Sequence, residues 1–324
     1  MHLTFALPPT AATGSSVGTD YVHGLMPGLR ALGHEVSATE GDEPMFPDGS
    51  VPVVDGFLLP HLHPRLAELV ERGAVAVVHH ASARAGRDEG AREAVGAIER
   101  DMLPKLRRVL ATSQAVADRL QTEFGVERVA VVPPGLPALP RSVPPPGPVQ
   151  VLSAGVLTPR KGFDTLLRAM APLQDMPWHL TIAGSTTRDP AHARQLVAMV
   201  TELGLDNRAS VATDPDADTM ERLWQSAGVF ALASRWEGYP SAVAAALRRG
   251  VPVFVTPAGS GNLVPQEAGV VCPADDLPTF SKSLRRVLFS DALRTDMAEG
   301  AWRIGQGLPG WDVQARLFYQ ALQE

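Results

Sequence analysis

The chain has 324 residues, a formal net charge of -6 and a hydrophobic content of 45%. This apolar fraction excludes intrinsic disorder, and the length predicts two domains or one large α/β unit. With 29 basic against 35 acidic residues, the balance argues against a surface that holds nucleic acid by counterion release. The single cysteine, Cys272, excludes an internal disulfide, and the first residues lack the pattern of a signal peptide. We therefore expect a cytoplasmic protein without membrane spans.

Short apolar runs alternate with amphipathic stretches in the first part of the chain. Strands are expected at HLTFAL, HEVSA, VVDGFLL, AVAVVH, RVLATS and VERVAVV, and a helix is expected from Gly18 to Leu32. Continuous runs of Val, Leu and Ala are typical of parallel strands that helices bury on both faces. The pattern predicts a doubly wound parallel sheet.

A proline-rich segment, residues 133–148, separates this pattern from a second copy of it. Proline fixes φ and removes an amide donor, so we expect an interdomain linker here. Beyond it, strands are expected at VQVLSAG, WHLTIAG, AGVFALAS, GVPVFVT and GVVCPA, and helices at residues 162–171, 191–203, 218–227 and 241–249.

The predicted organisation is therefore an α/β protein with two Rossmann-like doubly wound domains, over residues 1–140 and 149–305. The final segment, residues 306–324, carries apolar residues at helical spacing, and we expect it to pack back onto the first domain. Such sheets bind ligands outside the carboxyl ends of their strands, so we expect two facing domains with a cleft between them.

The segment GVLTPRKGFDTLLRAM, from Gly155 to Met170, connects an expected strand to an expected helix. Unpaired amides and the helix dipole suit a phosphate or diphosphate there, and Arg160 and Lys161 add full positive charge. The chain has only three lysines, so a lysine in this loop is not background usage. A solvated helix start with ordinary surface charge is the alternative, and the residues alone do not separate the two.

A second strand-to-helix corner is ALASRWEGYPSAVAAALRRGVPV. Gly238 lets a ligand approach the backbone closely, and Pro240 lies at the expected helix start. Glu237 is expected at the carboxyl end of its strand, where a carboxylate accepts hydrogen bonds from sugar hydroxyls. The alternative is that Glu237 only complements a helix dipole.

Two glycine-rich turns are weaker candidates. TPAGSGNLVPQEAG follows the strand GVPVFV, and its glycines either let backbone amides converge on an anion or serve only as loop. TGSSVGTD lies between the first strand and the first helix, where a nucleotide-binding fold approaches its ligand. It does not match GxGxxG, so the sequence gives no dinucleotide fingerprint there.

The histidines fall into two groups. His79 and His80 end the strand AVAVVH, at the mouth of the expected cleft. A neutral imidazole there can hydrogen-bond a substrate hydroxyl, and a satisfied structural histidine is the alternative. His61 and His63 alternate as on one side of a strand, but no nearby cysteine or carboxylate completes a set of ligands, so we expect no metal.

Together these corners resemble the retaining family 4 glycosyltransferases of the GT-B fold, known as glycosyltransferase group 1. The most specific pieces are RKGFDTLL and the EGYP corner with its GVPV strand. The resemblance implies that Lys161 binds the donor diphosphate, that Glu237 contacts the donor sugar and that His79 lies near that sugar. The implied donor-binding set is Gly18, Arg160, Gly162, Gly238, Tyr239, Pro240, Gly259, Asn262 and Leu263.

Three positions of the expected donor site depart from the family pattern. The family usually has Arg beside the glycine of the phosphate loop, where this chain has Val156, and Arg160 is the candidate substitute. The family pairs Glu237 with a second Glu that holds the ribose diol, and this chain has Ala245 there. A Pro-Glu pair is replaced by a Gly-Asn pair that ends at Asn262. The departures suggest an unusual donor, a relaxed nucleotide grip or a degenerate partner protein.

The implied chemistry is transfer of a sugar from a nucleoside-diphosphate donor to an acceptor hydroxyl with retention of configuration. The leaving phosphate helps to deprotonate the acceptor, and the protein stabilises negative charge on the diphosphate. Cationic side chains and helix dipoles serve in place of a metal, so no metal or other cofactor is expected. The expected partners are a nucleotide-sugar donor and a glycan, lipid-linked or small-molecule acceptor.

Two alternatives stay open. A non-catalytic glycosyltransferase-like subunit that binds a partner or glycan fits the three departures, and a nucleotide-sugar epimerase or a phosphorylase fits the same scaffold. Acceptor recognition is expected in first-domain loops, near residues 10–19 and 79–90. Peripheral membrane contact depends on a basic patch at Lys105, Arg107 and Arg108, for which a solvated face is the favoured interpretation.

Overall fold

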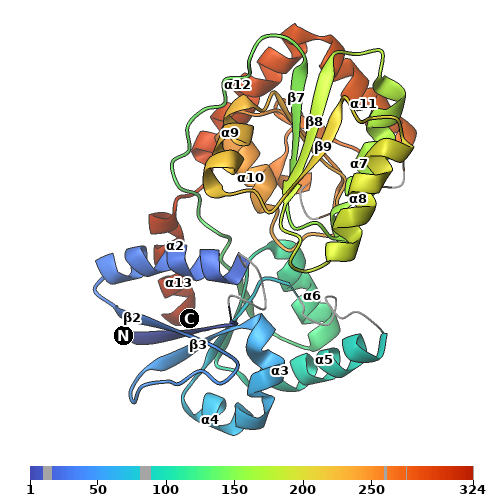
Figure 1. Ribbon diagram of the computed structural model, residues 1–324. Helices are drawn as coiled ribbons and strands as arrows, with labels where there is room; N and C mark the ends of the chain where they lie inside the picture. The colour runs from blue at the N-terminus through green and yellow to red at the C-terminus, as the bar shows by residue number, and fades with distance from the viewer. Residues whose placement is uncertain (10–16, 81–88, 259–260, 275, 324) are drawn as a thin grey trace. The chain divides into compact units, whose positions relative to one another are not determined.

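The chain forms two compact units, each with its own sheet and helices (Figure 1). Unit 1 comprises Met1–Pro137 and Pro309–Glu324, and unit 2 comprises Ala138–Leu308. The computed structural model describes residues 1–9, 17–80, 89–258, 261–274 and 276–323.

Unit 1 is built on a parallel sheet with the strand order β2-β1-β3-β4-β5-β6. The strands are β1 (His2–Leu7), β2 (Glu35–Glu40), β3 (Val51–Asp55), β4 (Val75–Val78), β5 (Arg108–Ala111) and β6 (Val129–Val131). The α-helices are α2 (Val17–Ala31), α3 (Leu59–Leu62), α4 (Leu66–Glu71), α5 (Glu89–Met102), α6 (Gln114–Phe124) and α13 (Trp311–Gln323). Short 3-10 turns complete the unit: η1 (Gly56–Leu58), η2 (His63–Arg65) and η4 (Leu103–Lys105).

Both faces of this sheet are covered by helices. Val77 of β4 belongs to the buried cluster that includes Leu25 of α2 and Phe318 of α13, whereas the next residue, Val78, belongs to the cluster that includes Leu120 of α6. Successive strand residues point to opposite faces, so a strand covered on both sides must be apolar throughout. This explains the continuous apolar runs, and the expected doubly wound sheet is confirmed.

The last helix, α13, packs against α2 within unit 1. Gly24 makes room for it, because a Cβ atom on Gly24 would lie 2.2 Å from the indole of Trp311. The rings of Trp311 and Tyr21 meet edge-on, with centroids 5.8 Å apart. The helix begins at Trp311 and not at residue 306 as expected, since α12 (Asp291–Gly307) ends just before it and Pro309 breaks the chain between the two.

Unit 2 repeats the architecture with the strand order β12-β11-β10-β7-β8-β9, also parallel. The strands are β7 (Val149–Ala154), β8 (Trp178–Gly184), β9 (Ala209–Thr213), β10 (Val229–Leu232), β11 (Val253–Val255) and β12 (Gly269–Val271). The remaining helices are α7 (Phe163–Met170), α8 (Pro190–Glu202), α9 (Ala217–Ser226), α10 (Ser241–Arg248) and α11 (Leu277–Phe289), with turns η5 (Pro159–Lys161), η6 (Ala171–Leu173) and η7 (Gly261–Leu263). The predicted helices before β11 are confirmed, with ends that differ by at most one residue.

The predicted strands differ from the observed ones at two places. The sequence did not predict β9, whose residues ASVAT lie at the edge of the sheet with only Ala209 buried. An edge strand needs no continuous apolar run, so its signal is weak. Conversely, VVDGFLL does not continue as a strand, because Asp55 ends β3 and caps the turn η1 by accepting a hydrogen bond from the amide of Phe57.

Candidate functional site

The strands β7 and β10 are neighbours in the unit 2 sheet, and both run in the same direction. The loop after β7 leads through η5 into α7, and the loop after β10 leads into α10. Parallel neighbours end at the same edge of a sheet, where doubly wound folds bind ligands. The two corners singled out in the sequence therefore lie side by side.

Backbone contacts hold the two loops together. Gly162 has a φ of 64°, and a Cβ atom there would lie 1.9 Å from the carbonyl oxygen of Ala233. The amide of Arg235 donates to the carbonyl of Arg160 at 2.7 Å, and its guanidinium pairs with Asp164 of α7 at 2.7 Å. Packing of one loop on the other is thus sufficient to require glycine at position 162.

Glu237 is the centre of the cluster. Its carboxylate is 4% exposed, and both of its oxygens are engaged. Oε1 accepts hydrogen bonds from Lys161 Nζ and from the Ser234 hydroxyl, each at 2.6 Å. Oε2 accepts from Arg160 Nη1 at 3.0 Å. A buried carboxylate with three charged or polar donors is fully satisfied without a ligand.

The charges of the cluster favour an ionised Glu237. Burial is the largest influence on its pKa and opposes ionisation, but Lys161 and then Arg160 outweigh it and hold the pKa of Glu237 below its usual value. For Lys161 the largest influence is also burial, which lowers the pKa of its ammonium, while Glu237 opposes that shift. Two cations thus share one carboxylate, and the cluster retains an excess of positive charge.

Arg160 is the more accessible of the two cations. Its side chain is 32% exposed, against 10% for Lys161. It also donates to the carbonyl of Trp236 at 3.0 Å, and its guanidinium lies 5.6 Å from the centre of that indole ring. These contacts hold the Arg160 guanidinium, a planar donor, in one orientation beside Glu237.

The helices that follow the two corners begin without side-chain caps. Gly162 precedes α7 and Pro240 precedes α10, and neither supplies a capping acceptor. First-turn amides and the helix dipole favour an anion at such ends. Gly238, just before α10, is buried. Burial raises the pKa of the half-buried Tyr239 to about 12, so the Tyr239 hydroxyl stays protonated at neutral pH.

The third corner is described only in part. Gly259 lies outside the described residues, whereas Asn262 and Leu263 end the turn η7. The Asn262 side chain is exposed, and Leu263 packs against the unit 2 core. The hydrogen bonds of Glu237 involve neither residue, and the assignment of this corner to the donor stays a prediction.

The other predicted site residues, His79 and Gly18, lie in unit 1. His79 follows β4 and is 3% exposed, and its Nε2 atom lies 3.4 Å from Oδ2 of Asp55. Gly18 lies in the first turn of α2, where a Cβ atom would be 1.9 Å from that same oxygen. Sequence reasoning missed Asp55. The signal that singled out His79, a polar residue directly after a buried strand, is also present in the run VVD.

His61 and His63 do not share one side of a strand, because α3 and η2 occupy this stretch. His61 lies 3.8 Å from Asp42, and His63 lies 3.0 Å from Asp101, with side chains about half exposed in both pairs. Within the described residues, His, Cys, Asp and Glu side chains form no cluster of three or more suited to a metal.

The basic patch before β5 is partly neutralised within unit 1. Lys105 pairs with Asp101 at 2.6 Å, and the Arg107 guanidinium donates to the carbonyl of Leu322 at 3.2 Å. Both contacts fit a solvated face. Of the helices that the structure describes, none combines the length and apolar character that a membrane span requires.

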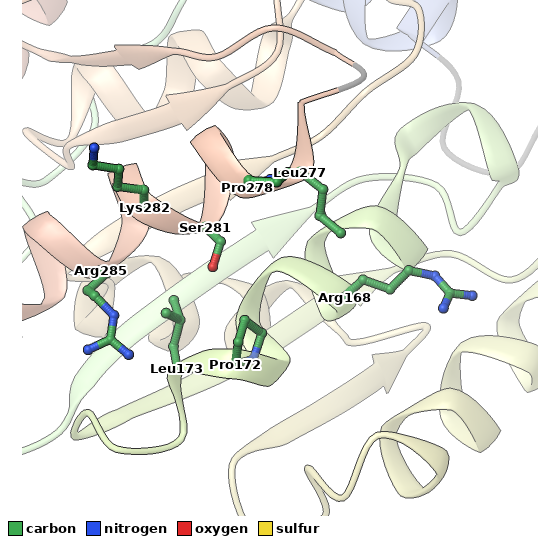
Figure 2. A pocket seen from close by; sticks show the side chains of 8 residues that line it. All are labelled: Arg168, Pro172, Leu173, Leu277, Pro278, Ser281, Lys282 and Arg285. Carbon is green, nitrogen blue, oxygen red and sulfur yellow. The ribbon is translucent and has the colours of Figure 1, made fainter.

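A separate hollow of about 380 Å³ lies at the far end of α7, beside α11 (Figure 2). Figure 2 shows Arg168 and Lys282 directed away from each other at its rim. Arg285, also at the rim, pairs with Asp175 at 2.7 Å. The apolar lining comes from Pro172, Leu173, Leu277 and Pro278. The cations do not converge, in contrast to those around Glu237.

The fold places the protein among the GT-B structures, which pair two doubly wound α/β domains. A sucrose-phosphate synthase from Thermosynechococcus elongatus is 18% identical with a TM-score of 0.83, over 99% of this chain and 98% of that chain. Anabaena HepE, in complex with UDP and glucose, is 16% identical with a TM-score of 0.77, over 100% of both chains. At these identities the likeness establishes the fold.

Sequence comparison identifies the family. Residues 139–303 match glycosyl transferases group 1, and the chain belongs to this family. The amylovoran biosynthesis glycosyltransferase AmsD of Erwinia amylovora is 26% identical over 156 residues, 48% of this chain and 42% of that protein. A D-inositol 3-phosphate glycosyltransferase of Xylanimonas cellulosilytica is 26% identical over 229 residues, 64% of this chain and 54% of that protein. The chain thus spans about half the length of these curated relatives.

Proposed function

We propose that the protein is a glycosyltransferase that moves a sugar from a nucleoside-diphosphate donor to an acceptor hydroxyl with retention of configuration. The observation that carries the proposal is the cluster at the carboxyl edge of the unit 2 sheet, in which Lys161 and Arg160 share the Glu237 carboxylate. Family membership supports the reaction class. The UDP and glucose bound by HepE support a nucleotide-sugar donor.

In this proposal Lys161 and Arg160 bind the donor diphosphate. The cluster has more positive than negative charge, and the first-turn amides of α7 and α10 add partial positive charge. Negative charge on the diphosphate grows as the sugar leaves, so these groups bind the transition state more tightly than the ground state. The excess of cation over carboxylate is what suits the site to a dianionic leaving group.

Glu237 changes partners in this proposal. Without donor it accepts hydrogen bonds from Lys161, Arg160 and Ser234. When the diphosphate draws the two cations toward its own oxygens, the carboxylate becomes available to hydroxyls of the transferred sugar. His79 of unit 1 contacts a sugar hydroxyl.

The reaction needs no protein nucleophile. The bond between the anomeric carbon and the leaving phosphate oxygen breaks, and the acceptor oxygen bonds to the same face of that carbon. The acceptor proton passes to the departing phosphate oxygen. Glu237 supplies charge and binding, and the protein's own cations stabilise the leaving group, so the scheme includes no metal.

The departures from the family pattern weaken the expected contacts to the ribose more than those to the diphosphate. Arg160 supplies the second cation that Val156 does not, since its Nη1 atom lies 3.0 Å from the carboxylate that Lys161 also contacts. Ala245 offers no acceptor for a ribose diol, and a charged hydrogen bond of this kind contributes about 1.5 to 3 kcal/mol. We expect the affinity for the nucleotide to depend mainly on its diphosphate.

A turnover assay tests the proposal. The full chain is incubated with UDP-, GDP-, ADP- and TDP-hexoses and a panel of acceptors, namely free sugars, inositol phosphates and lipid-linked glycans. Release of nucleoside diphosphate that requires an acceptor supports transfer, and NMR of the product assigns its anomeric configuration. A product of inverted configuration contradicts the retaining mechanism, and release without any acceptor dependence contradicts transfer.

A second candidate, a non-catalytic subunit that binds a glycan or partner, is favoured by Val156 and Ala245. It predicts that nucleotides bind weakly and that no donor is turned over, while a glycan array still captures the chain. Turnover of any donor by the isolated chain eliminates it.

A further inference from the structure

Asp55 and His79 form a buried pair at the carboxyl ends of two neighbouring strands of unit 1. Asp55 ends β3 and His79 follows β4, and these strands pair in parallel. Each side chain is 2% exposed, and His79 Nε2 lies 3.4 Å from Asp55 Oδ2. This is the edge at which doubly wound sheets bind their ligands.

Three polar atoms of this pair have no hydrogen-bond partner among the residues that the structure describes: Oδ2 of Asp55 and both ring nitrogens of His79. Buried polar groups are almost always hydrogen-bonded, since leaving them unpaired destabilises the fold. Oδ2 and Nε2 face each other at 3.4 Å, so a small approach of the two side chains pairs them, whereas Nδ1 needs a partner from another molecule. Single buried atoms without a partner also occur elsewhere in the described residues, for example at Ser153 and His192, whereas here three lie on two side chains that face each other.

The surroundings hold the pair in one orientation. Asp55 Oδ1 is fixed by the amide of Phe57 at 2.9 Å, which leaves Oδ2 to face His79. The Tyr21 ring meets the imidazole edge-on at 5.2 Å, and its hydroxyl is anchored on the carbonyl of Val132 at 2.9 Å. Gly18 of α2 closes against Oδ2, with no room for a Cβ atom. Neither side chain can turn away without displacing these neighbours.

We propose that Asp55 is the positioning residue for His79, an inference that rests on the proposed function. Asp55 accepts the Nε2–H of His79, which fixes the tautomer and leaves Nδ1 to meet a hydroxyl of a bound substrate. A neutral imidazole has one donor and one acceptor nitrogen, and a partner on one nitrogen decides the character of the other. The present 3.4 Å separation is of the kind that shortens when substrate binds.

The histidine tautomer gives a test that does not require turnover. The full chain is labelled with ¹⁵N-histidine, and the two His79 ring nitrogens are assigned by their loss in His79→Gln. We expect a protonated Nε2 and an unprotonated Nδ1 in the wild type. In Asp55→Asn, Oδ1 keeps its contact to the amide of Phe57, so the side-chain NH2 group faces Nε2 and donates to it. We therefore expect the tautomer to invert, with Nε2 unprotonated and Nδ1 protonated.

Asp101→Asn is the matched control, because it breaks a second His–Asp pair of unit 1, His63 with Asp101, which is half exposed. It is expected to leave the His79 resonances unchanged. Unchanged His79 resonances in Asp55→Asn overturn the proposal, whether or not the wild type is a glycosyltransferase.

Kinetics then separate positioning from a merely structural contribution. With the donor found in the turnover assay, Asp55→Asn is expected to lower kcat tenfold or more, with KM for the donor within threefold of the wild type and an unchanged melting temperature. Equal kcat in Asp55→Asn and Asp101→Asn contradicts the proposal. If the wild type turns over no donor, the proposed function fails, and the tautomer measurement alone decides whether Asp55 orients His79.

Discussion

Each unit buries a carboxylate at the carboxyl edge of its sheet, but the surrounding residues treat the two differently. Glu237 of unit 2 receives hydrogen bonds from Lys161, Arg160 and Ser234. Asp55 of unit 1 faces His79 at 3.4 Å, and within the described residues neither its Oδ2 nor the imidazole nitrogens make a hydrogen bond. The hydrogen bonds of Glu237 therefore help to hold the two loops together. Asp55 and His79, in contrast, have polar atoms for which the described residues supply no hydrogen bond.

The contrast separates two kinds of buried carboxylate by their expected effect on the free energy of unfolding. Removing one partner of a buried, fully paired carboxylate costs several kcal/mol, because the remaining charge stays buried without compensation. An unpaired one costs stability in the resting fold, so its presence points to a partner that arrives later. We therefore expect substitutions in the two clusters to differ in their effects on stability and activity.

Lys161→Ala has the largest expected effect. Loss of a preorganised cation from the leaving-group site is expected to lower kcat by about 100- to 1,000-fold. Lys282→Ala is the matched control, since it removes an exposed lysine of the same unit from the rim of the hollow beside α11. Steady-state rates with the best donor provide the measurement, and an equal loss in both variants contradicts a special role for Lys161.

Glu237→Gln and Asp55→Asn compare the carboxylates directly. Glu237→Gln leaves Lys161 buried without its counter-charge, so we expect the free energy of unfolding to fall by about 3 kcal/mol. Asp55→Asn removes a charge with an unpaired oxygen, so we expect a change of less than about 1 kcal/mol. Urea denaturation measures both, and similar losses would contradict the comparison.

The contribution of Glu237 to the free energy of unfolding is also expected to depend on pH. Because the ion pairs hold the pKa of Glu237 below its ordinary value of 4.5, they stabilise the fold fully above pH 4.5. That stabilisation is lost as pH falls below 4.5 and through the lowered folded-state pKa. The gap between wild type and Glu237→Gln in urea denaturation should therefore shrink on acidification, and a gap that widens contradicts the assignment.

Ala245→Glu restores the carboxylate that the family places eight residues after Glu237. One charged hydrogen bond to a ribose hydroxyl contributes about 1.5 to 3 kcal/mol, which corresponds to roughly tenfold or more in affinity. Calorimetry with nucleoside diphosphates measures the gain, and Ala242→Glu, also half-buried in α10, is the control. Unchanged affinity in Ala245→Glu would show that the ribose is not held from this helix.

Arg160→Lys has the smallest expected effect. It keeps the positive charge but loses the guanidinium geometry that contacts both Glu237 and the carbonyl of Trp236. We expect donor affinity to fall by about fivefold, the equivalent of about 1 kcal/mol. A fall as large as that of Lys161→Ala would mean that Arg160, and not Lys161, is the main diphosphate ligand.

Much of the fold was predictable because buried parallel strands carry continuous apolar runs, and β4, β10 and β11 are of this kind. The edge strand β9 was not predictable, since its partly exposed residues need no such run. The strand expected through VVDGFLL failed because Asp55 caps a turn instead of continuing the ladder. Capping competes with strand formation through a single side chain, which periodicity does not register.

The candidate site was predictable where charge follows a strand. Lys161 and Glu237 were chosen separately, and the structure brings them to 2.6 Å of each other. Their direct pairing was not predictable, because it depends on β7 and β10 being neighbours in the sheet although they are far apart in sequence. Asp55 carries the same local signal as His79, a polar residue at the end of a buried strand, but its contact with His79 was not predictable because it depends on β4 lying beside β3.

The most direct test of the central claim is calorimetric binding of UDP, GDP, ADP and TDP to the wild type, Lys161→Ala and Lys282→Ala. The account predicts that at least one nucleotide binds the wild type, that Lys161→Ala weakens it tenfold or more, and that Lys282→Ala binds as the wild type does. Binding that is equal in all three proteins, or absent at millimolar nucleotide in the wild type, would contradict the claim that the Lys161, Arg160 and Glu237 cluster receives a donor diphosphate.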